Sequence, residues 1–168
     1  ERHERIGVPS LLGVLGGEVR MGAPVGRRAN GHVLPERERI LEALAQYAPV
    51  ERDPVVLTEH VRVALRRAIT HRYAPSGELC AFRLAPEIEE AVRDAIQRTP
   101  SGNYLALSPD LSTEIVAAIG TALAAWPDAP RVVLTQLDVR RYLRRLIEVD
   151  HPDVAVLSVQ EIAPEVVV

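Results

Sequence analysis

The 168-residue sequence predicts a mixed α/β (α+β) fold, in which a short helical subdomain precedes a β-α-β-α-β-α-β subdomain. Three observations lead to this prediction. Apolar residues recur at helical spacing over residues 35–75, without an intervening strand pattern. From residue 76 onward, short apolar runs typical of strands alternate with helical segments, as in helices packed against a sheet. Apolar residues make up 47% and charged residues 26% of the chain, which is typical of a soluble globular domain.

Residues 1–34 are expected to form a flexible segment outside both subdomains. They hold seven of the ten glycines and show no persistent helical or strand period. The stretch GVLGGEV lacks the Gly-Lys-Ser/Thr ending of a phosphate-binding loop. A secretory signal peptide is rejected because the apolar stretch contains a proline, follows acidic residues and lacks an Ala-x-Ala cleavage site.

The helical subdomain is expected to span residues 35–75 and to contain two helices. Pro35 starts the first helix and Pro49 stops it. Its apolar side carries Ile40, Leu41, Leu44 and Tyr47. The second helix is predicted from LTEHVRVALRRAITHRY, with Thr58 as its N-cap. Its apolar residues are Val61, Leu65, Ala68 and Ile69.

The α/β subdomain is expected to span residues 76–168. Its first strand, at 78–84, alternates between two sides. Leu79, Ala81 and Arg83 share one side, and Cys80, Phe82 and Leu84 share the other. A helix at 86–98 follows, with Pro86 in its first turn. The next expected elements are a strand at 103–108 and a helix at 109–126.

The last three elements complete the predicted alternation. The run RVVLT at 131–135 contains a continuous apolar stretch at 132–134, which favours a strand buried in the sheet. A helix at 137–149 follows, and VAVLS at 154–158 is predicted as the fourth strand. Aromatic residues are only 4% of the chain, so the core is expected to be aliphatic.

The helix at 137–149 carries two arginine pairs, at 140–141 and 144–145. On a helical wheel these arginines form one polar arc, and the apolar arc lies opposite. The apolar arc contains Val139, Tyr142, Leu143, Leu146 and Ile147. A nucleic-acid-binding helix also shows arginine doublets, but residues 76–168 carry eight arginines against 14 acidic residues. A solvated or protein-contacting face is therefore favoured over a nucleic-acid site.

No group of residues predicts a catalytic, cofactor or metal site. The single cysteine, Cys80, excludes an internal disulfide, and its apolar strand context indicates a buried core thiol. Asp150, His151 and Asp153 share one loop, but Pro-Asp before a strand is typical of a turn. Two alternatives stay open. One is a free-standing α/β enzyme acting through Asp150, His151 or Ser158, and the other is a nucleic-acid-binding module using the helix at 137–149.

Several motifs, in order, resemble one family. They are ILEALA at 40–45, Asp53-Pro54, LTEHVRVALRR at 57–67, LALSPDL at 105–111, VVLTQLDVRRYLRRLIE at 132–148 and PDVAVLSVQEI at 152–162. Together they resemble the cytoplasmic domain of the bacterial type III secretion export gate, the FHIPEP family of flagella and injectisomes. The resemblance runs from about residue 38 to residue 168.

The resemblance implies a non-enzymatic role in protein secretion, with no cofactor. Family members assemble a homo-nonameric cytoplasmic ring that receives chaperone–substrate complexes, gatekeeper proteins and ATPase-complex proteins. An N-terminal region upstream anchors them in the bacterial inner membrane, and the soluble domain lies at the cytoplasmic face of that membrane. Residues 38–75 would then end the helical third subdomain, and residues 76–162 would form the α/β fourth. An injectisome, and therefore virulence, is favoured over a flagellar system.

Within this resemblance, two arginine groups are predicted to bind other proteins rather than nucleic acid. The predicted residues are Arg62, Arg66, Arg67, Arg140, Arg141, Arg144 and Arg145. An exposed ion pair contributes only about 0.2–1 kcal/mol. The predicted effect is therefore collective, with acidic surfaces of a neighbouring subunit or client as the partners.

Overall fold

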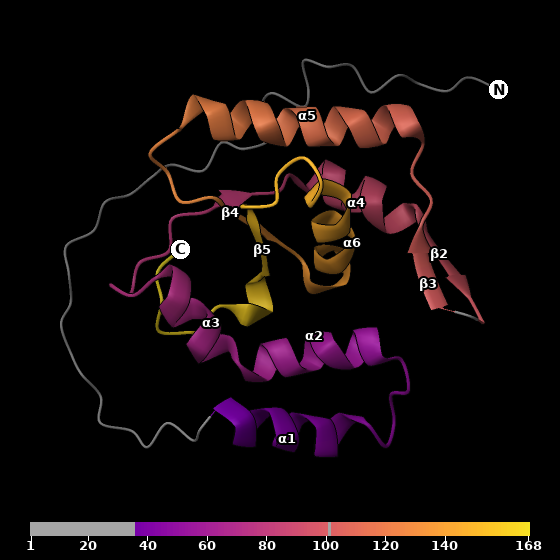
Figure 1. The fold of residues 1–168 in the computed structure, drawn as a ribbon, viewed down its shortest axis with the longest axis vertical. Helices are drawn as coiled ribbons and strands as arrows, with labels where there is room; N and C mark the ends of the chain where they lie inside the picture. Colours follow the sequence, from indigo (N-terminus) through magenta and orange to yellow (C-terminus); the bar gives the residue numbers. More distant parts are fainter. Residues whose placement is uncertain (1–35, 101) are drawn as a thin grey trace.

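The computed structural model describes residues 36–100 and 102–168, so the predicted Gly-rich segment at 1–34 lies outside the described residues. Figure 1 shows a layer of two helices beneath an α/β body, which confirms the predicted fold class. The helices are α1 (Glu36–Tyr47), α2 (Pro54–Ala64), α3 (Arg66–Tyr73), α4 (Pro86–Asp94), α5 (Pro109–Ala125) and α6 (Leu137–Ile147). None of these helices has the length and apolar character needed to cross a membrane.

The central sheet is parallel, with strand order β1-β4-β5. Its strands are β1 (Phe82–Arg83), β4 (Val132–Thr135) and β5 (Ala155–Ser158). Every residue of β4 is buried because both faces of the sheet are covered, as its continuous apolar run predicts. Val133 packs with residues of α4, α5 and α6 on one face. Val132 and Leu134 pack on the other face with α3 and the C-terminal segment.

The predicted strand at 78–84 is paired with β4 only at Phe82 and Arg83. Its earlier part pairs with the C-terminus, where the Leu79 amide donates to the Val167 carbonyl at 2.9 Å. The predicted alternation is confirmed, because Leu79 and Phe82 enter different core clusters. Cys80, predicted to be buried, is only half-buried.

Two predicted elements are present, but the helix is shorter than predicted and the strand lies outside the central sheet. The helix predicted at 86–98 ends at Asp94, and strand β2 (Ile96–Thr99) follows it. The segment predicted as a second sheet strand is β3 (Gly102–Leu105), which pairs antiparallel with β2 in a separate hairpin. Two parallel neighbouring strands need a crossover connection of about a dozen residues. The connection between β2 and β3 is far too short for that, so these two strands pair antiparallel.

The start of the second predicted helix is also corrected. Helix α2 begins at Pro54, and the side chain of Asp53 caps it by accepting a hydrogen bond from the Val55 amide at 2.8 Å. Thr58, predicted to be the N-cap, lies inside the helix and donates to the Pro54 carbonyl. The Asp-Pro pair explains the earlier start, because Asp is a good N-cap and Pro suits the first helical position. The helix is also divided, since Leu65 separates α2 from α3.

Replacing Asp53 with alanine is expected to lower the free energy of unfolding by about 0.5–2 kcal/mol, because the amide of Val55 loses its acceptor. Thr58→Ala is the matched control and should change it by less than about 0.5 kcal/mol. Urea denaturation followed by circular dichroism measures both variants. An equal loss in the two variants would contradict the assignment of Asp53 as the cap.

The sequence-based boundary between residues 35–75 and 76–168 stays a prediction. Helix α3 belongs to the predicted helical subdomain, but its residues Ile69 and Tyr73 pack against the sheet. The Thr70 hydroxyl is buried and donates to the Glu161 carbonyl at 3.0 Å. Glu161 ends the short helix η2 (Val159–Glu161), which directly follows β5. The two predicted subdomains therefore share an extensive polar and apolar contact.

Candidate protein-binding arginines

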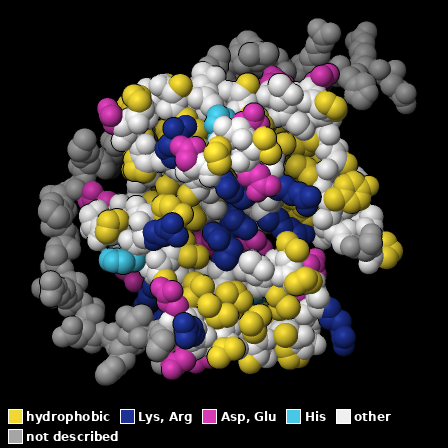
Figure 2. Space-filling view, viewed as in Figure 1, with side chains coloured by type: hydrophobic (Ala, Val, Ile, Leu, Met, Phe, Trp, Pro, Cys, Tyr) yellow, Lys and Arg dark blue, Asp and Glu magenta, His cyan; other side chains and the backbone are white. Residues whose placement is uncertain are grey.

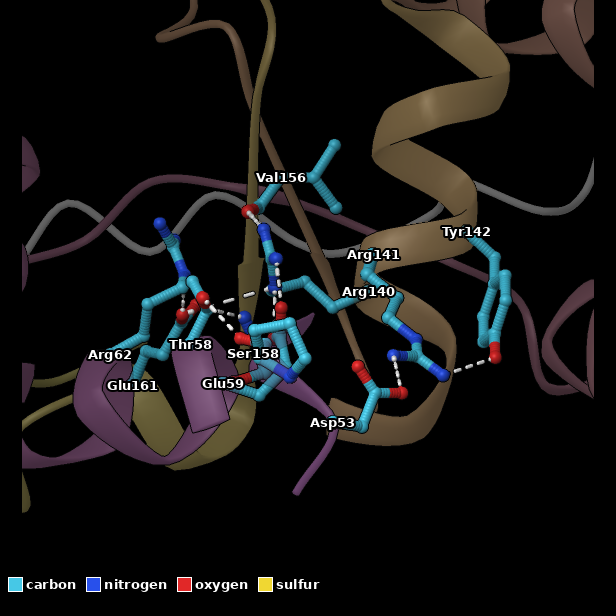
Figure 3. Close-up of polar contacts among 11 residues, drawn as sticks. Asp53, Thr58, Glu59, Arg62, Arg140, Arg141, Tyr142, Val156, Ser158 and Glu161 are labelled. Carbon is cyan, nitrogen blue, oxygen red and sulfur yellow. Dashed lines mark hydrogen bonds and ion pairs between the residues drawn. The ribbon is translucent and has the colours of Figure 1, made fainter. Parts of the chain in front are cut away.

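Arg140 of α6 is buried between the two predicted subdomains, with 8% of its surface exposed. Its guanidinium binds the Glu59 carboxylate of α2 in a bidentate manner (Figure 3). The Arg140 Nε donates to Glu59 Oε2 at 2.6 Å, and Nη2 donates to Oε1. Two parallel charge-assisted hydrogen bonds fix both the distance and the orientation of the pair. This contact therefore determines how α2 sits on α6.

Glu161 extends the same cluster and is fully buried. One of its oxygens accepts a hydrogen bond from the Nε of Arg62 on α2, and this oxygen lies 4.0 Å from Arg140 Nε. Its other oxygen accepts the Ser158 amide at 2.7 Å. Two arginines and two glutamates thus balance each other's charge at the junction. We call Glu59, Arg62, Arg140 and Glu161 the junction cluster.

The prediction that all four arginines of this helix lie on one open polar face is therefore wrong for Arg140. The wheel places Arg140 at the edge of the basic arc, only about 20° from Ile147 at the edge of the apolar arc. Helix α2 then covers that side, and the buried carboxylate of Glu59 compensates the charge. In Figure 2 the dark blue side chains gather across the middle of the molecule, above the α1–α2 layer.

The pKa of Arg140 reflects this environment. Burial acts to lower it, but the hydrogen bonds that Arg140 donates to Glu59 and the negative charges of Glu59 and Glu161 outweigh burial, so the pKa is raised above its ordinary value. A guanidinium with a raised pKa stays charged throughout the range in which proteins fold. Arg140 therefore carries its positive charge at the junction under all ordinary conditions.

Arg141 and Arg144 also contact their own chain. Figure 3 shows the Arg141 guanidinium between Asp53 and Tyr142, with one nitrogen 3.9 Å from the Asp53 carboxylate. The guanidinium carbon also lies 4.6 Å from the centre of the Tyr142 ring, a cation–π contact. Arg144 donates to the Val154 carbonyl at 2.7 Å, and so holds the loop before β5. Both side chains are half-buried.

Arg66, Arg67 and Arg145 are the predicted residues that lie exposed. Arg67 forms an ion pair within its own chain, in which its Nε lies 3.4 Å from a Glu165 carboxylate oxygen. Both side chains of that pair are more than half exposed. Such a pair is weak, so Arg67 can exchange Glu165 for another carboxylate at little cost. Of the seven predicted arginines, these three are the best placed to meet a partner.

Asp138, which interrupts the basic arc, is bound to α4. Its carboxylate accepts from the Arg93 Nε at 2.5 Å. This hydrogen bond lowers the pKa of Asp138, against the opposing effect of desolvation, and raises the pKa of Arg93. Both side chains are about half exposed, so the pair adds little to stability.

The structure does not bring together the residues of the alternative enzyme hypothesis. Ser158 is fully buried beside Glu161. His151 instead packs on α5, where its Nε2 lies 3.3 Å from the Val116 carbonyl oxygen. Asp153 binds Arg131 at 2.9 Å. Among residues 36–100 and 102–168, no group of three or more His, Cys, Asp or Glu side chains is placed to hold a metal ion.

Sequence reasoning missed the acidic partners of these arginines. Glu59 and Glu161 are almost fully buried. Buried Glu89 of α4 was also missed, and it accepts hydrogen bonds from the Thr135 hydroxyl at 2.9 Å and from the Gln136 amide at the start of α6. One signal was available, because Glu59 lies on the same helical side as the apolar Val56 and Val63. A charged residue in such a position is rarely buried without a partner.

Comparison with known proteins relates the chain to the invasion protein InvA of Salmonella typhimurium. The chain is 40% identical to InvA over 126 residues, which cover 74% of this chain and 18% of InvA. The solved C-terminal domain of InvA superposes with a TM-score of 0.72 at 39% identity, and the match covers 76% of this chain and 40% of that domain. The chain thus spans less than a fifth of the full length of this relative.

Two further solved structures are similar. The nonameric EscV cytosolic domain from a type III secretion system matches with a TM-score of 0.67 at 37% identity, over 79% of this chain and 40% of EscV. CdsV of Chlamydia pneumoniae, solved in complex with CdsO, matches with a TM-score of 0.68 at 41% identity, over 78% of this chain and 39% of CdsV.

A model of one protein family covers nearly all of the chain that the structure describes. The model of the FHIPEP family matches residues 34–167. This range contains α1 through β5, and also the junction cluster. The resemblance inferred from the ordered motifs is confirmed, and the chain belongs to the FHIPEP family.

Proposed function

We propose that the chain is part of the cytoplasmic ring domain of a type III secretion export gate. In this role it takes part in protein export through ring assembly and the docking of chaperone–substrate complexes, without catalysing a reaction. The observation that carries the proposal is the similarity of sequence and fold to the C-terminal domain of InvA and to the nonameric cytosolic domain of EscV. The gate itself would sit at the bacterial inner membrane, held there by a region outside this chain, with this part on the cytoplasmic face.

The proposed partners follow from the relatives. The nonameric EscV domain supports self-association, and the CdsV–CdsO complex supports binding of a second protein of the secretion apparatus. Secretion chaperones with their substrates, gatekeeper proteins and ATPase-complex proteins complete the proposed set. Nucleic acid is not proposed, because the basic arc of α6 is largely engaged by carboxylates and carbonyls of this chain.

The predicted protein-binding arginines take different parts in this proposal. Arg66, Arg67 and Arg145 are exposed and are proposed to contact partners directly. Arg62 and Arg140 are proposed to act indirectly, because they hold the junction cluster and thereby the relative position of α2 and α6. Arg141 and Arg144 have the same indirect role through Asp53 and the loop before β5.

A chimera tests the proposed function. The segment of InvA that matches residues 34–167 is replaced by those residues, in a Salmonella typhimurium strain without its own InvA. Export of a secreted substrate into the medium is measured, and the size of the assembled InvA complex is measured in parallel. We expect both export and assembly to persist, because fold and family agree over this segment.

The matched control is InvA with its own segment returned through the same two joints. If the control exports and the chimera is present at the same level but neither assembles nor exports, the proposed function is wrong. Assembly without export would keep the ring part of the proposal and reject the docking part.

A further inference from the structure

A groove lies between α1 on one side and α2 with α3 on the other, with a volume of about 430 Å³. This volume falls within the range of sites that take a small molecule or a few side chains. None of the acidic partners of the junction cluster lines it. The groove is thus separate from the contacts that hold the two predicted subdomains together.

The charged groups of the groove are mostly basic. Arg39 of α1 and the exposed pair Arg66 and Arg67 of α3 line it. Glu42 is the one carboxylate among the lining residues. The local formal charge is therefore +2 (three arginines less one glutamate), even with His60 counted as neutral. A concave surface with this excess concentrates anionic groups.

Arg39 has a hydrogen-bond donor without an acceptor among the described residues. The Nε of Arg39 is buried from solvent and has no acceptor among residues 36–100 and 102–168. Buried donors in folded proteins nearly always find an acceptor, so an unused one beside a basic groove indicates a site for an external acceptor. A carboxylate suits a guanidinium best, because its two oxygens match the planar fork of donors.

The remaining lining residues of the groove favour an acidic side chain over a free ion as the ligand. Ala43, Val63 and Ala64 provide an apolar floor. The rings of Tyr47 and His60 stack at 4.1 Å between centroids, with only 4° between their planes, and extend this flat surface. A free phosphate ion gains nothing from such a floor, whereas the methylene groups of an acidic side chain and its neighbours are desolvated on it.

At one end of the groove, a carboxylate of this chain already contacts one of the lining arginines. Glu165, in the segment after η2, places a carboxylate oxygen 3.4 Å from the Arg67 Nε. Both side chains are more than half exposed, so this contact leaves Arg67 open to exchange. Arg39 and Arg66 do not share it. A carboxylate thus already reaches the groove from outside, but only at its edge.

We propose that this groove binds a glutamate side chain from an acidic peptide segment of a partner protein. The carboxylate binds between the guanidinium groups of Arg39 and Arg66. The Arg39 side chain turns on binding, so that its Nε, which is buried in the free chain, donates to one of the carboxylate oxygens. The aliphatic stem and the adjacent residues of the peptide pack on Ala43 and the Tyr47–His60 stack. The inference rests on the groove alone and is independent of the export function proposed above.

The test uses the full chain, labelled for NMR, and two synthetic peptides. One is N-acetyl-Ala-Leu-Glu-Glu-Leu-Ala-amide, and the other carries glutamine in place of both glutamates. We expect the glutamate peptide to shift the amide signals of residues 39–47 and 60–67, with a dissociation constant at least about tenfold lower than that of the glutamine peptide. Inorganic phosphate is titrated in parallel and is expected to bind at least about tenfold more weakly.

Arg39→Gln is expected to weaken binding of the glutamate peptide about tenfold, because the variant removes the positive charge and the forked donors of the guanidinium but keeps a polar side chain. Arg37→Gln is the matched control, since Arg37 is exposed on the same helix and does not line the groove. It should change binding by less than about twofold. The melting temperature of each variant shows that the fold is retained.

Several outcomes would overturn the inference. They are the absence of binding by the glutamate peptide, equal binding of the two peptides, equal effects of the two variants, and phosphate binding as tight as that of the peptide. The last outcome would assign the groove to a free oxyanion instead. None of them bears on the chimera experiment, because this titration uses the separate chain without any secretion apparatus.

Discussion

Arg140→Ala is expected to lower the free energy of unfolding by about 3–5 kcal/mol. The variant leaves the Glu59 carboxylate at a junction where its residue is only 7% exposed, without the two hydrogen bonds that compensate its charge. An uncompensated buried charge costs far more than an exposed ion pair contributes, so this expected loss exceeds that of an exposed arginine such as Arg67. Urea denaturation, followed by circular dichroism and extrapolated to water, measures it.

The control removes both charges of the pair. A double variant with Glu59→Leu and Arg140→Met fills a similar volume with apolar groups and leaves neither charge unpaired. Its free energy of unfolding should lie within about 1.5 kcal/mol of the unmodified protein, since replacing a buried ion pair by packed apolar residues is often neutral. A double variant as unstable as the sum of the two single variants would show that the two side chains are not coupled.

Arg140→Ala also tests whether the junction cluster positions the exposed arginines. If the junction cluster holds α2 on α6, the variant should weaken the contacts between the helical subdomain and the α/β subdomain. These contacts should then be lost before the α/β core unfolds. Amide hydrogen exchange in α2 should then accelerate more than exchange in β4. Equal acceleration in both elements would indicate that the chain unfolds as a single unit.

Leu143→Ala is expected to lower the free energy of unfolding by about 2–5 kcal/mol. Leu143 is fully buried in the core cluster that α6 shares with α4, α5 and one face of the sheet. Truncation removes three carbon atoms and leaves a cavity that the surrounding elements, fixed by the sheet, fill only in part. The same denaturation experiment measures the loss.

Leu41→Ala is the matched control for this substitution. Leu41 lies on the outer side of α1 and is 66% exposed, so the same truncation should change stability by less than about 0.5 kcal/mol in the isolated chain. A large loss at Leu41 would contradict its exposed position on α1. A small loss at Leu143 would contradict the assignment of the core.

Local signals predicted the long elements of the α/β part well. Helix α5 was expected at 109–126 and is observed at Pro109–Ala125, where the Ser108 side chain and Pro109 mark its start. Strand β4 was predictable because a strand buried on both faces has a continuous apolar run. Helix α6 was predictable because an amphipathic helix has apolar residues on one side of its wheel. The ordered motifs then identified the family, which the match over residues 34–167 confirms.

Two helix boundaries were predicted wrongly because apolar spacing and the positions of Gly and Pro indicated different boundaries. Residues 96–99 have adequate helical spacing, yet they form β2 because Gly102 adopts a positive φ of 123° and turns the chain into a hairpin. At α2 the sequence offers two good N-caps, Thr58 and Asp53, and the Pro at position 54 favours the earlier one. Both corrections could have been made from sequence by giving Gly and Pro more weight than apolar spacing.

The sequence by itself determined the α/β class, the aliphatic core, the amphipathic character of α6 and the family. These properties depend on residues within one or two helical turns, or on motifs read in order. Only the tertiary structure decided that Arg140 is a buried structural residue, while Arg66 and Arg67 face a groove. The reason is physical, because an arginine at the edge of an apolar face is equally suited to water and to a carboxylate. Glu59 is the carboxylate that makes burial of Arg140 possible. It lies 81 residues away along the chain and contacts Arg140 only when α2 and α6 pack together.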